Sequence, residues 1–311
     1  MRCVSLGCHV TLMSRSLSKE FNIAPIRKQV QIKLFDMSKW DKAKSALPTM
    51  LPEQDVIFHM AAQTSHIESM GEPIKDLYTN CGGTLALLEA CRVFAPDATV
   101  VMPGTVTQVG RVVSLPVSEE LADWPLSLYD THKLTCEKYL HVYYENYGLK
   151  TTTLRLANVF GERQQLNNPH RGVLNLMLKR AMTGQPITIY EPGDFIRDYS
   201  YVQNVVDALL LAAISEQTAG ESYVFGSGIG MKFFEMIEQL ADEVNSLLGV
   251  ETEIRWVPFP TSEKKIDAGD FIADNHKFSE HTGWFPNLSF AEGLQNTIQF
   301  YQEHLGDYDI E

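Results

Sequence analysis

The stretch ATVVMPGTVTQVG, residues 98–110, gives the clearest indication of the fold. Its first half is a short β-branched apolar run, typical of a strand that is buried on both faces. Its second half turns polar, and Thr105 follows the strand directly. In open parallel sheets, ligands bind beyond the carboxyl ends of the strands. Thr105 therefore stands where a hydroxyl that serves a ligand is expected.

Similar apolar runs recur along the chain and alternate with longer segments whose apolar residues have helical spacing. The expected strands cover residues 9–13, 29–35, 55–60, 98–103 and 150–156. The expected helices cover residues 73–94, 131–147, 172–184, 201–217, 232–247 and 290–305. This alternation predicts an α/β fold, a doubly wound parallel sheet of the Rossmann type, followed by a smaller C-terminal domain.

The beginning of the sequence departs from that plan. The first expected strand, HVTLM, follows only a few residues that resemble the end of a helix. A doubly wound nucleotide-binding domain begins with a strand, a Gly-rich loop and a helix, and a βαβ unit spans about 30 residues or more. We therefore expect the opening strand and its Gly-rich loop to be missing, so that the sequence is truncated at its N-terminus.

Composition excludes several classes of function. The 311 residues carry a net charge of −13, which argues against a nucleic-acid partner, because such partners require a basic face. No apolar run is long enough to cross a membrane, and the N-terminus has no signal-peptide pattern. The five cysteines lack C-x-x-C spacing, and no histidine pair has the spacing of a metal site. These features predict a soluble cytoplasmic protein without a metal site.

Tyr129 and Lys133 lie four residues apart in the stretch YDTHKLTCEKY, residues 129–139. Residues with this spacing share one face of a helix, and a neighbouring ammonium lowers the pKa of a tyrosine toward working pH. The resulting tyrosinate can act as a general base, and the hydroxyl of Thr105 could bind the same substrate oxygen. The structural alternative is a surface lysine beside a half-buried tyrosine, with Thr105 as an ordinary turn residue.

Further segments combine with this pair into a family pattern. The segments are HMAAQTS (59–65), TNCGGTLALLEACR (79–92), GTVTQVG (104–110), YDTHK (129–133), LRLANVFGERQ (154–164), FIRDYSYVQNVVDALLLA (195–212), and IAD (272–274) with HTGWFP (281–286). Together they resemble the extended short-chain dehydrogenases/reductases of the NAD-dependent epimerase/dehydratase family, which act on nucleotide-diphosphate sugars. The resemblance extends over nearly the whole chain.

The resemblance implies catalytic and cofactor-binding roles. Tyr129 is the expected base, Lys133 lowers its pKa and holds the nicotinamide ribose, and Thr105 completes the catalytic set. The segment 59–65 is similar to the family loop under the nicotinamide ribose, and Asp36 matches the residue that holds adenine. The full set of expected cofactor-binding residues is Ser14, Arg15, Asp36, Met37, Met60, Ala61, Ala62, Tyr129 and Lys133.

The resemblance also implies where the sugar nucleotide binds. Asn158 and Arg197 are expected at its diphosphate, where a guanidinium suits two phosphate oxygens at once. Lys264 stands near the position of a further family arginine and is expected to meet phosphate as a point charge. The implied domains are a dinucleotide-binding domain over 1–162, rejoined at about 195–226, and a substrate domain over 163–194 and 227–311.

Three departures from the family pattern bear on function. The chain has no G-x-x-G-x-x-G loop, whose backbone amides hold the pyrophosphate of the cofactor. Ser14 and Arg15 stand where NAD-binding members carry an aspartate, which leaves NADP open beside NAD. Val106 and Thr107 follow Thr105, where dehydratases carry Asp-Glu and decarboxylases carry a glutamate two residues on. Elimination and decarboxylation therefore lose their expected acid–base group.

The sequence thus predicts a nucleotide-diphosphate-sugar epimerase, namely a UDP-sugar 4-epimerase that works by transient oxidation with bound NAD. Two alternatives stay open. One is an NADPH-dependent reductase of a 4-keto nucleotide sugar, and the other is a catalytically impaired sugar-nucleotide-binding protein. By family analogy, the helices at 74–94 and 131–147 form the seam of a homodimer.

Overall fold

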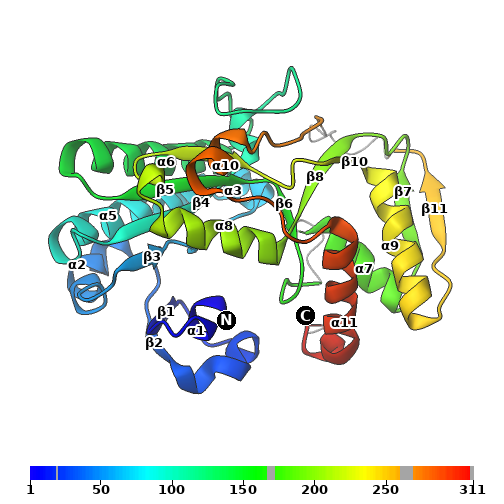
Figure 1. The fold of residues 1–311 in the computed structure, drawn as a ribbon, viewed down its shortest axis with the longest axis horizontal. Coiled ribbons are helices and arrows are strands. Elements are labelled where there is room, and N and C mark those ends of the chain that lie inside the picture. The colour runs from blue at the N-terminus through cyan, green and yellow to red at the C-terminus, as the bar shows by residue number, and fades with distance from the viewer. Residues whose placement is uncertain (19, 167–171, 260–268, 309–311) are drawn as a thin grey trace. The chain divides into compact units, whose positions relative to one another are not determined.

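The computed structural model describes residues 1–18, 20–166, 172–259 and 269–308. The chain forms two compact units. The first consists of Met1–Gln108, Trp124–Arg155 and Leu209–Ser222, and the second consists of Val109–Asp123, Leu156–Ala208 and Tyr223–Glu311. Each unit therefore combines segments that lie far apart in the sequence, as the colours of Figure 1 show.

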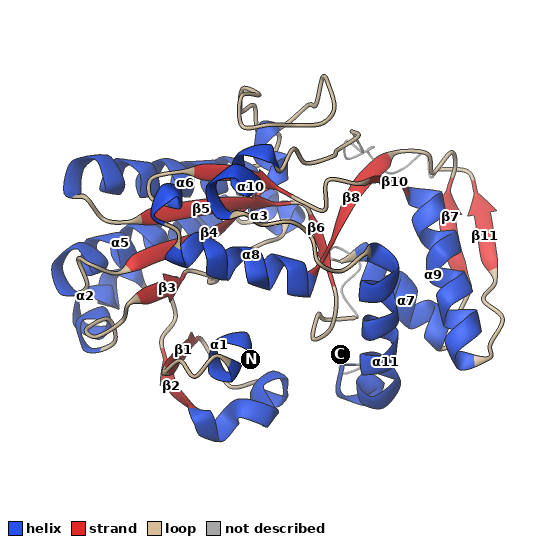
Figure 2. Ribbon diagram, viewed as in Figure 1, coloured by secondary structure: helices blue, strands red, loops and turns tan. Residues whose placement is uncertain are grey.

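The main sheet has four strands in the order β3-β4-β5-β9. These strands are β3 (Val56–Phe58), β4 (Thr99–Thr105), β5 (Thr151–Leu156) and β9 (Ser222–Phe225). Strand β3 runs parallel to β4, and helices lie between successive strands in the sequence (Figure 2). The prediction of an α/β fold with a parallel sheet is thereby confirmed. The division between the two units falls within β5 and β9.

Two helices form the framework beside β4. Helix α5 (Gly83–Phe94) packs against α6 (Leu128–Tyr147), and α6 also packs against β4. Helix α6 begins at Ser127, whose hydroxyl accepts a hydrogen bond from the backbone N–H of Asp130. It ends at Gly148, which adopts the left-handed conformation that glycine tolerates best. These local signals fix the start of α6 and so the position of Tyr129 in its first turn.

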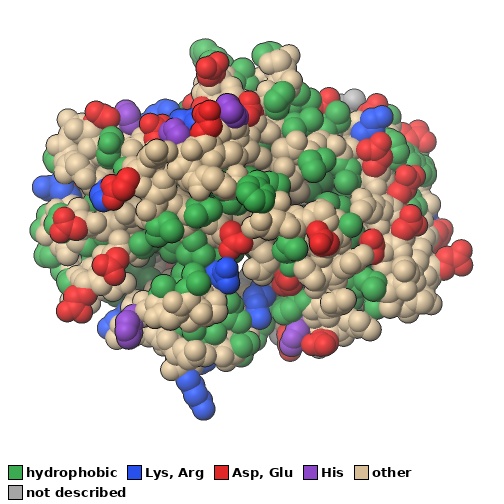
Figure 3. All heavy atoms as spheres, in the orientation of Figure 1, with side chains coloured by type: hydrophobic (Ala, Val, Ile, Leu, Met, Phe, Trp, Pro, Cys, Tyr) green, Lys and Arg blue, Asp and Glu red, His purple; other side chains and the backbone are tan. Residues whose placement is uncertain are grey.

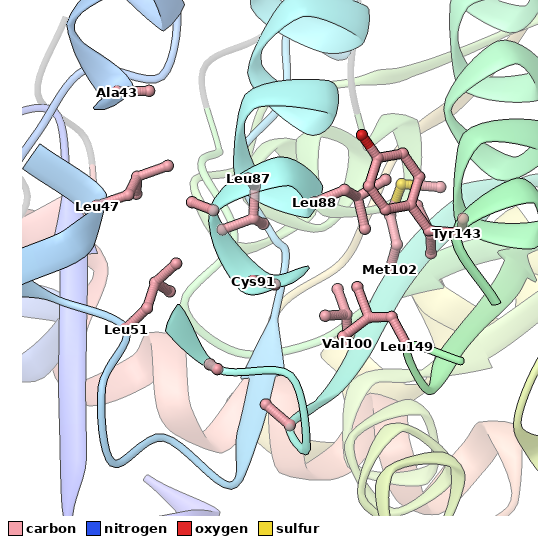
Figure 4. Close-up of a cluster of buried hydrophobic side chains, with 14 of the residues drawn as sticks. Ala43, Leu47, Leu51, Leu87, Leu88, Cys91, Val100, Met102, Tyr143 and Leu149 are labelled. Carbon is pink, nitrogen blue, oxygen red and sulfur yellow. The ribbon is translucent and has the colours of Figure 1, made fainter. Parts of the chain in front are cut away.

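A buried apolar cluster joins these elements. Leu88 of α5 lies near Met102 of β4 and Tyr143 of α6, and Leu47 and Leu51 lie on the other side of α5 (Figure 4). Leu47 and Leu88 are fully buried. The amphipathic α5 therefore packs on two sides, which holds β4 and α6 in one core.

A second, separate pair of parallel strands lies toward the N-terminus. Strand β1 (Val10–Ser14) pairs with β2 (Val30–Leu34), and neither joins the sheet that contains β3 (Figure 1). No residue of β1 or β3 is fully buried, whereas five of the six residues of β5 are. The preceding helix α1 (Arg2–Ser5) buries no side chain. The β1–β2 pair is therefore much less enclosed than β4 and β5.

Shorter helices complete the first unit. They are η1 (Glu20–Gln29), η2 (Trp40–Lys42), α2 (Ala43–Ala46), η3 (Leu47–Thr49), α3 (His66–Gly71), α4 (Pro73–Leu77), the π-helical turn η4 (Tyr78–Gly82), η5 (Val106–Val109) and η6 (Glu216–Thr218). Strands β1 to β5 and helices α5 and α6 match the predicted segments. The expected continuous helix over 73–94 is instead divided into α4, η4 and α5.

The second unit has two small sheets and several helices. One sheet has the order β10-β8-β6, from β6 (Asn158–Phe160), β8 (Ile196–Tyr201) and β10 (Gly230–Lys232), and the other pairs β7 (Ile187–Tyr190) with β11 (Ile254–Val257). The helices are α7 (Val173–Met182), α9 (Phe233–Leu248), α10 (His276–Thr282) and α11 (Phe290–Tyr308), and α8 (Val202–Ile214) spans the division between the units. Helix α9 packs against both α7 and α11.

Acidic side chains do not gather into one patch on the face of the molecule that Figure 3 shows. Figure 3 shows Asp and Glu side chains scattered across the face in view, in keeping with the net charge of −13. Among the residues that the structure describes, no helix is long and apolar enough to cross a membrane. The described residues also contain no group of His, Cys, Asp and Glu that could hold a metal ion. All five cysteines are free thiols.

Candidate active site

The carboxyl ends of parallel strands carry the predicted site residues of the first unit. Thr105 is the last residue of β4, Ser14 is the last residue of β1, and Asp36 follows β2 by two residues. Met60 and Ala61 follow β3 in the same way. This is the end of a parallel sheet at which ligands bind, so the strands alone place these residues in the expected region.

Tyr129 and Lys133 lie one turn apart on α6, and both are buried, with 8% and 5% of their surface exposed. The backbone N–H of Tyr129 donates a hydrogen bond of 3.0 Å to the hydroxyl of Ser69. The ring of His66 meets the ring of Tyr129 edge to face, with 5.0 Å between their centroids. The pair is therefore held by its surroundings and does not match the alternative of a surface lysine.

Burial lowers the pKa values of Lys133 and of His59. Removal from water lowers the pKa of the Lys133 ammonium below the usual value, although nearby Cys136, Cys81 and Glu137 raise it. The same cause lowers the pKa of buried His59 to about 3, and the charge of Lys133 contributes to that shift. The imidazole of His59 is neutral as a result. Its Nε2 lies 2.9 Å from the hydroxyl of Thr84 on α5.

Thr105 is connected to the residue that follows Tyr129. Its hydroxyl lies 2.8 Å from the hydroxyl of Thr107, and Thr107 donates a short hydrogen bond to Asp130. The backbone N–H of Thr105 donates to the side chain of Gln108 at 3.0 Å. The structure thus links the end of β4 to the first turn of α6 by side chains.

Asp130 is the centre of a network that sequence reasoning missed. It is buried, and its carboxylate accepts hydrogen bonds from Thr107 and, at 2.6 Å, from Ser127, while Nδ1 of His66 lies 3.3 Å away. Burial alone would raise the pKa of this carboxyl, but the bonds from His66, Ser127 and Thr107 lower it below the usual value. Asp130 is therefore ionised at neutral pH. The only sequence signal was an acid beside the predicted base.

The loop after β3 has a buried and an exposed part. His59 is buried, whereas Met60 is 59% exposed. The loop is fixed from below, because Asn80 of the π-helical turn accepts from the backbone N–H of Gln63 and donates to its carbonyl. Ala61 is exposed and Ala62 is half-buried. Met60 and Ala61 therefore reach the surface, while His59 stays in the core.

Ser14, Arg15 and Asp36 lie close together beyond β1 and β2. The N–H of Phe35 donates to the carbonyl of Ser14 at 3.0 Å, and the charge of Arg15 helps to lower the pKa of Asp36. The carboxylate of Asp36 also accepts two hydrogen bonds from Ser38. Met37 is buried, in the space that a side chain at Gly83 of α5 would enter. Both bonds from Ser38 go to the same oxygen of Asp36, Oδ1.

These residues fit part of a nicotinamide dinucleotide. Polar groups beyond β1 and β2 suit an adenosine, and the loop after β3 together with Lys133 suits a nicotinamide ribose. The pyrophosphate between them would need backbone amides or cations. The two ends of the cofactor site are therefore recognisable, whereas its centre is not.

Two predicted substrate-binding residues lie in the second unit. Asn158 begins β6 and is exposed, and β6 runs parallel to β8, which carries Arg197. Arg197 stacks over the ring of Phe195 at 4.6 Å and donates to the carbonyls of Ile196 and Gly269. Lys264 lies outside the described residues.

The residue after Arg197 has a structural role. Asp198 is buried and accepts hydrogen bonds from the backbone N–H groups of Ser227, Gly228 and Ala273. The carboxylate therefore closes the glycine-containing turn that follows β9. The short strands β6 and β8 gain a fixed position next to this turn.

Comparisons with known proteins agree with this geometry. A model of the NAD dependent epimerase/dehydratase family matches residues 3–226. The UDP-glucose 4-epimerase of Mycolicibacterium smegmatis is 30% identical over 272 residues, which cover 86% of this chain and 83% of the relative.

Two solved structures are similar over almost the full length. The UDP-glucose 4-epimerase of Thermotoga maritima with UDP-glucose has a TM-score of 0.86 and 28% identity, covering 98% of this chain and 94% of that one. The UDP-glucose 4-epimerase of Thermus thermophilus in complex with NAD has a TM-score of 0.81 and 28% identity, covering 97% and 93%. The chain accordingly belongs to the NAD dependent epimerase/dehydratase family.

Proposed function

We propose that this protein is a nucleotide-diphosphate-sugar epimerase that inverts C4 of a UDP-sugar with bound NAD. One observation carries the proposal above the others. Tyr129 and Lys133 are buried one turn apart on α6, and Thr105 at the end of β4 is linked to that turn through Thr107 and Asp130. A buried tyrosine beside an ammonium is suited to take a proton from a sugar hydroxyl.

Each member of the site has a distinct role. Tyr129 takes the proton of the 4-hydroxyl and later returns it. Lys133 keeps the phenolate accessible through its charge and holds a ribose hydroxyl of the cofactor. Thr105 contacts the reacting sugar oxygen or a hydroxyl next to it. The nicotinamide, when bound, supplies a reversible acceptor for the hydrogen on carbon.

The residues after Thr105 favour epimerisation over elimination. An elimination at C5 and C6 needs an acid–base group beside the catalytic threonine, and Val106 and Thr107 have none. Asp130 does bring a carboxylate near, but it is only 3% exposed and its oxygens accept bonds from inside the protein. It cannot serve as a free acid for a substrate.

The choice of substrate rests on the second unit and on the relatives. Asn158 and Arg197 occupy neighbouring parallel strands, where an amide and a guanidinium can bind a diphosphate. Three relatives with 28–30% identity are named UDP-glucose 4-epimerases. UDP-glucose and UDP-galactose are therefore the first pair to test.

The test is a product assay. The purified chain is incubated with UDP-galactose and NAD⁺, and the products are followed by proton NMR. We expect UDP-glucose to form until the two sugars reach equilibrium, with no net consumption of cofactor. If UDP-galactose and its C2-acetamido and C6-carboxyl analogues all remain unchanged in protein that binds NAD, the proposal is wrong.

Two alternatives have specific support. Arg15 beyond β1 is a cation where NADP carries its 2′-phosphate, which favours a 4-keto-sugar reductase, and stoichiometric consumption of NADPH would identify it. The absence of a G-x-x-G-x-x-G sequence favours a sugar-nucleotide-binding protein without catalysis. Binding of a UDP-sugar with no affinity for either dinucleotide would identify that function.

The proposal includes a homodimer in a reducing compartment such as the cytoplasm. Exposed apolar side chains follow one another along α4, η4 and α5, namely Ile74, Leu77, Tyr78 and Leu85, and Val142 on α6 is 46% exposed. Burial of such side chains in a second copy would remove apolar surface from water. Sedimentation that shows only monomer at micromolar concentration would contradict this seam. The five free thiols fit the compartment.

A further inference from the structure

The hydrogen-bond chain from Asp130 to Thr105 has a fixed direction. An ionised carboxylate only accepts hydrogen bonds, so the hydroxyl of Thr107 must donate its single hydrogen to Asp130. The oxygen of Thr107 must then accept the hydrogen of Thr105, which lies 2.8 Å away. The hydrogen of Thr105 is thereby turned toward Thr107. The Thr105 oxygen also accepts from the backbone N–H of Thr107 at 3.4 Å, so one lone pair remains for a ligand.

The carboxylate at the end of this chain is itself held in place. Ser127 donates to Asp130 at 2.6 Å and accepts from its backbone N–H at 3.1 Å. Because the hydrogen of Ser127 is used, Nδ1 of His66, at 3.1 Å from the Ser127 oxygen, must act as a donor. Donors therefore surround the carboxylate, and the direction of the whole network follows from its charge.

We propose that Asp130 is a positioning residue that acts through Thr107 to make Thr105 a hydrogen-bond acceptor toward the sugar. This inference rests on the proposed epimerase function and deepens it. The 4-hydroxyl of the sugar can donate its single hydrogen to Thr105 on binding and must turn it to Tyr129 before that base takes the proton. The ketone formed by oxidation has no hydrogen to donate to Thr105. Thr105 therefore holds the alcohol and releases the ketone, and a 4-epimerase must let the ketone present its other face before it is reduced again.

The first experiment measures the oxidised sugar on the enzyme. Wild type and D130N are mixed with UDP-galactose and NAD⁺, and the near-ultraviolet absorbance of the reduced nicotinamide reports the steady-state fraction of ketone. In D130N the amide can donate to Thr107, which frees the hydrogen of Thr105 to hold the ketone. We expect that fraction to rise about two- to tenfold, the effect of one neutral hydrogen bond, and kcat to fall while KM changes little.

Matched variants distinguish a change in the orientation of the Thr105 hydroxyl from a change in folding. T107V removes the relay without a charge change and should raise the ketone fraction as D130N does, whereas T107S keeps the hydroxyl and should behave as wild type. The double variant T105V/D130N should stay within about twofold of T105V alone, because Asp130 acts only through Thr105. An unchanged ketone fraction in D130N and T107V, or equal and independent losses in the double variant, would overturn the proposal.

A measurement without turnover keeps this test distinct from the test of the epimerase function. In protein labelled at threonine, NMR should detect slowly exchanging hydroxyl protons of Thr105 and Thr107, since both are engaged in hydrogen bonds. In T107V the Thr107 signal should vanish and the Thr105 signal should exchange with water. Absence of both signals from the wild type would overturn the relay even if the protein proved to be an active epimerase.

Discussion

Strands β5 and β1 are both short, and all of β1 and all but the last residue of β5 belong to the first unit, yet the two strands differ sharply in burial. Five of the six residues of β5 are buried, whereas none of β1 is. Strand β4 resembles β5, and its neighbour β3 resembles β1. The difference separates a closed half of the unit, built on β4, β5, α5 and α6, from an open half built on β1 and β2.

The two halves carry different parts of the candidate site. Thr105, Tyr129 and Lys133 belong to the closed half, where Tyr129 and Lys133 are buried and the hydroxyl of Thr105 is hydrogen-bonded to Thr107. Ser14, Arg15 and Asp36 belong to the open half, where the strands offer few enclosing contacts. The proposed catalytic residues therefore lie on a well-packed core, whereas the residues proposed to bind the cofactor lie on the less enclosed strands.

The largest expected effect is on catalysis in the closed half. Replacing Tyr129 with Phe removes the proposed base but keeps the ring that packs against His66. We expect kcat to fall by about 10²–10⁴, with the urea midpoint of unfolding unchanged. Steady-state kinetics and urea unfolding on the same preparation measure both. Near-full activity of Y129F would remove the tyrosine from the mechanism.

The next largest expected effect is a loss of stability when the ion pair between Arg155 of β5 and Glu137 of α6 is broken. Arg155 donates to both oxygens of Glu137 at 2.8 and 2.7 Å, and each side chain is 3% exposed. Arg155→Met leaves the carboxylate buried with fewer donors, so we expect a loss of about 3–5 kcal/mol in the free energy of unfolding. The control is Arg155→Met with Glu137→Leu, which should recover most of that loss. An equal loss in both variants would show that packing, rather than charge, holds this position.

A pair of leucines, one in each half, tests the difference in packing between β5 and β1. Leu154 of β5 is fully buried, whereas Leu12 of β1 is half-buried. Leu154→Ala should cost about 2–5 kcal/mol because it leaves a closed cavity. Leu12→Ala should cost less than about half of that, since its side chain already meets solvent. Urea unfolding of both variants gives the comparison, and equal losses would show that β1 is as well packed as β5.

The smallest expected effect is a dependence of folding stability on pH through Asp130. Hydrogen bonds lower the pKa of Asp130 below its unfolded value of about 3.9, so folding gains stability above that value. The gain is lost as the pH falls through the folded-state pKa, where the folded carboxyl takes up its proton. We therefore expect the stability difference between wild type and D130N to shrink as the pH falls from about 5 through the folded-state pKa. A constant difference would mean that Asp130 is not ionised in the folded protein.

Sequence patterns predicted the closed half well because its signals are strong. β-Branched runs gave the strands, and the glycine after α6 gave the end of that helix. The helix was expected from residue 131, whereas Ser127 starts it at Leu128. The spacing of Tyr129 and Lys133 placed both on one face. The π-helical turn at Tyr78–Gly82 was not predicted, because its residues continue the helical pattern and only the contacts of Asn80 reveal it.

Other features depend on contacts that no local pattern records. The sheet of β6, β8 and β10 was missed because two of its strands have three residues each and its neighbours are far apart in sequence. The pairing of Asp130 with His66 joins residues separated by more than sixty positions. In the sequence, Thr107 was notable only because it stands where related enzymes carry an acidic residue. In the structure its hydroxyl donates a hydrogen bond to Asp130.

The central claim is that the open half binds NAD and so supports the chemistry of the closed half. Calorimetric titration of the purified chain with NAD⁺ and then NADP⁺, each in the presence and absence of UDP, tests it most directly. We expect saturable binding of one NAD⁺ per chain, tighter than the binding of NADP⁺. Binding of UDP with no heat from either dinucleotide would contradict it and leave a sugar-nucleotide-binding protein as the function.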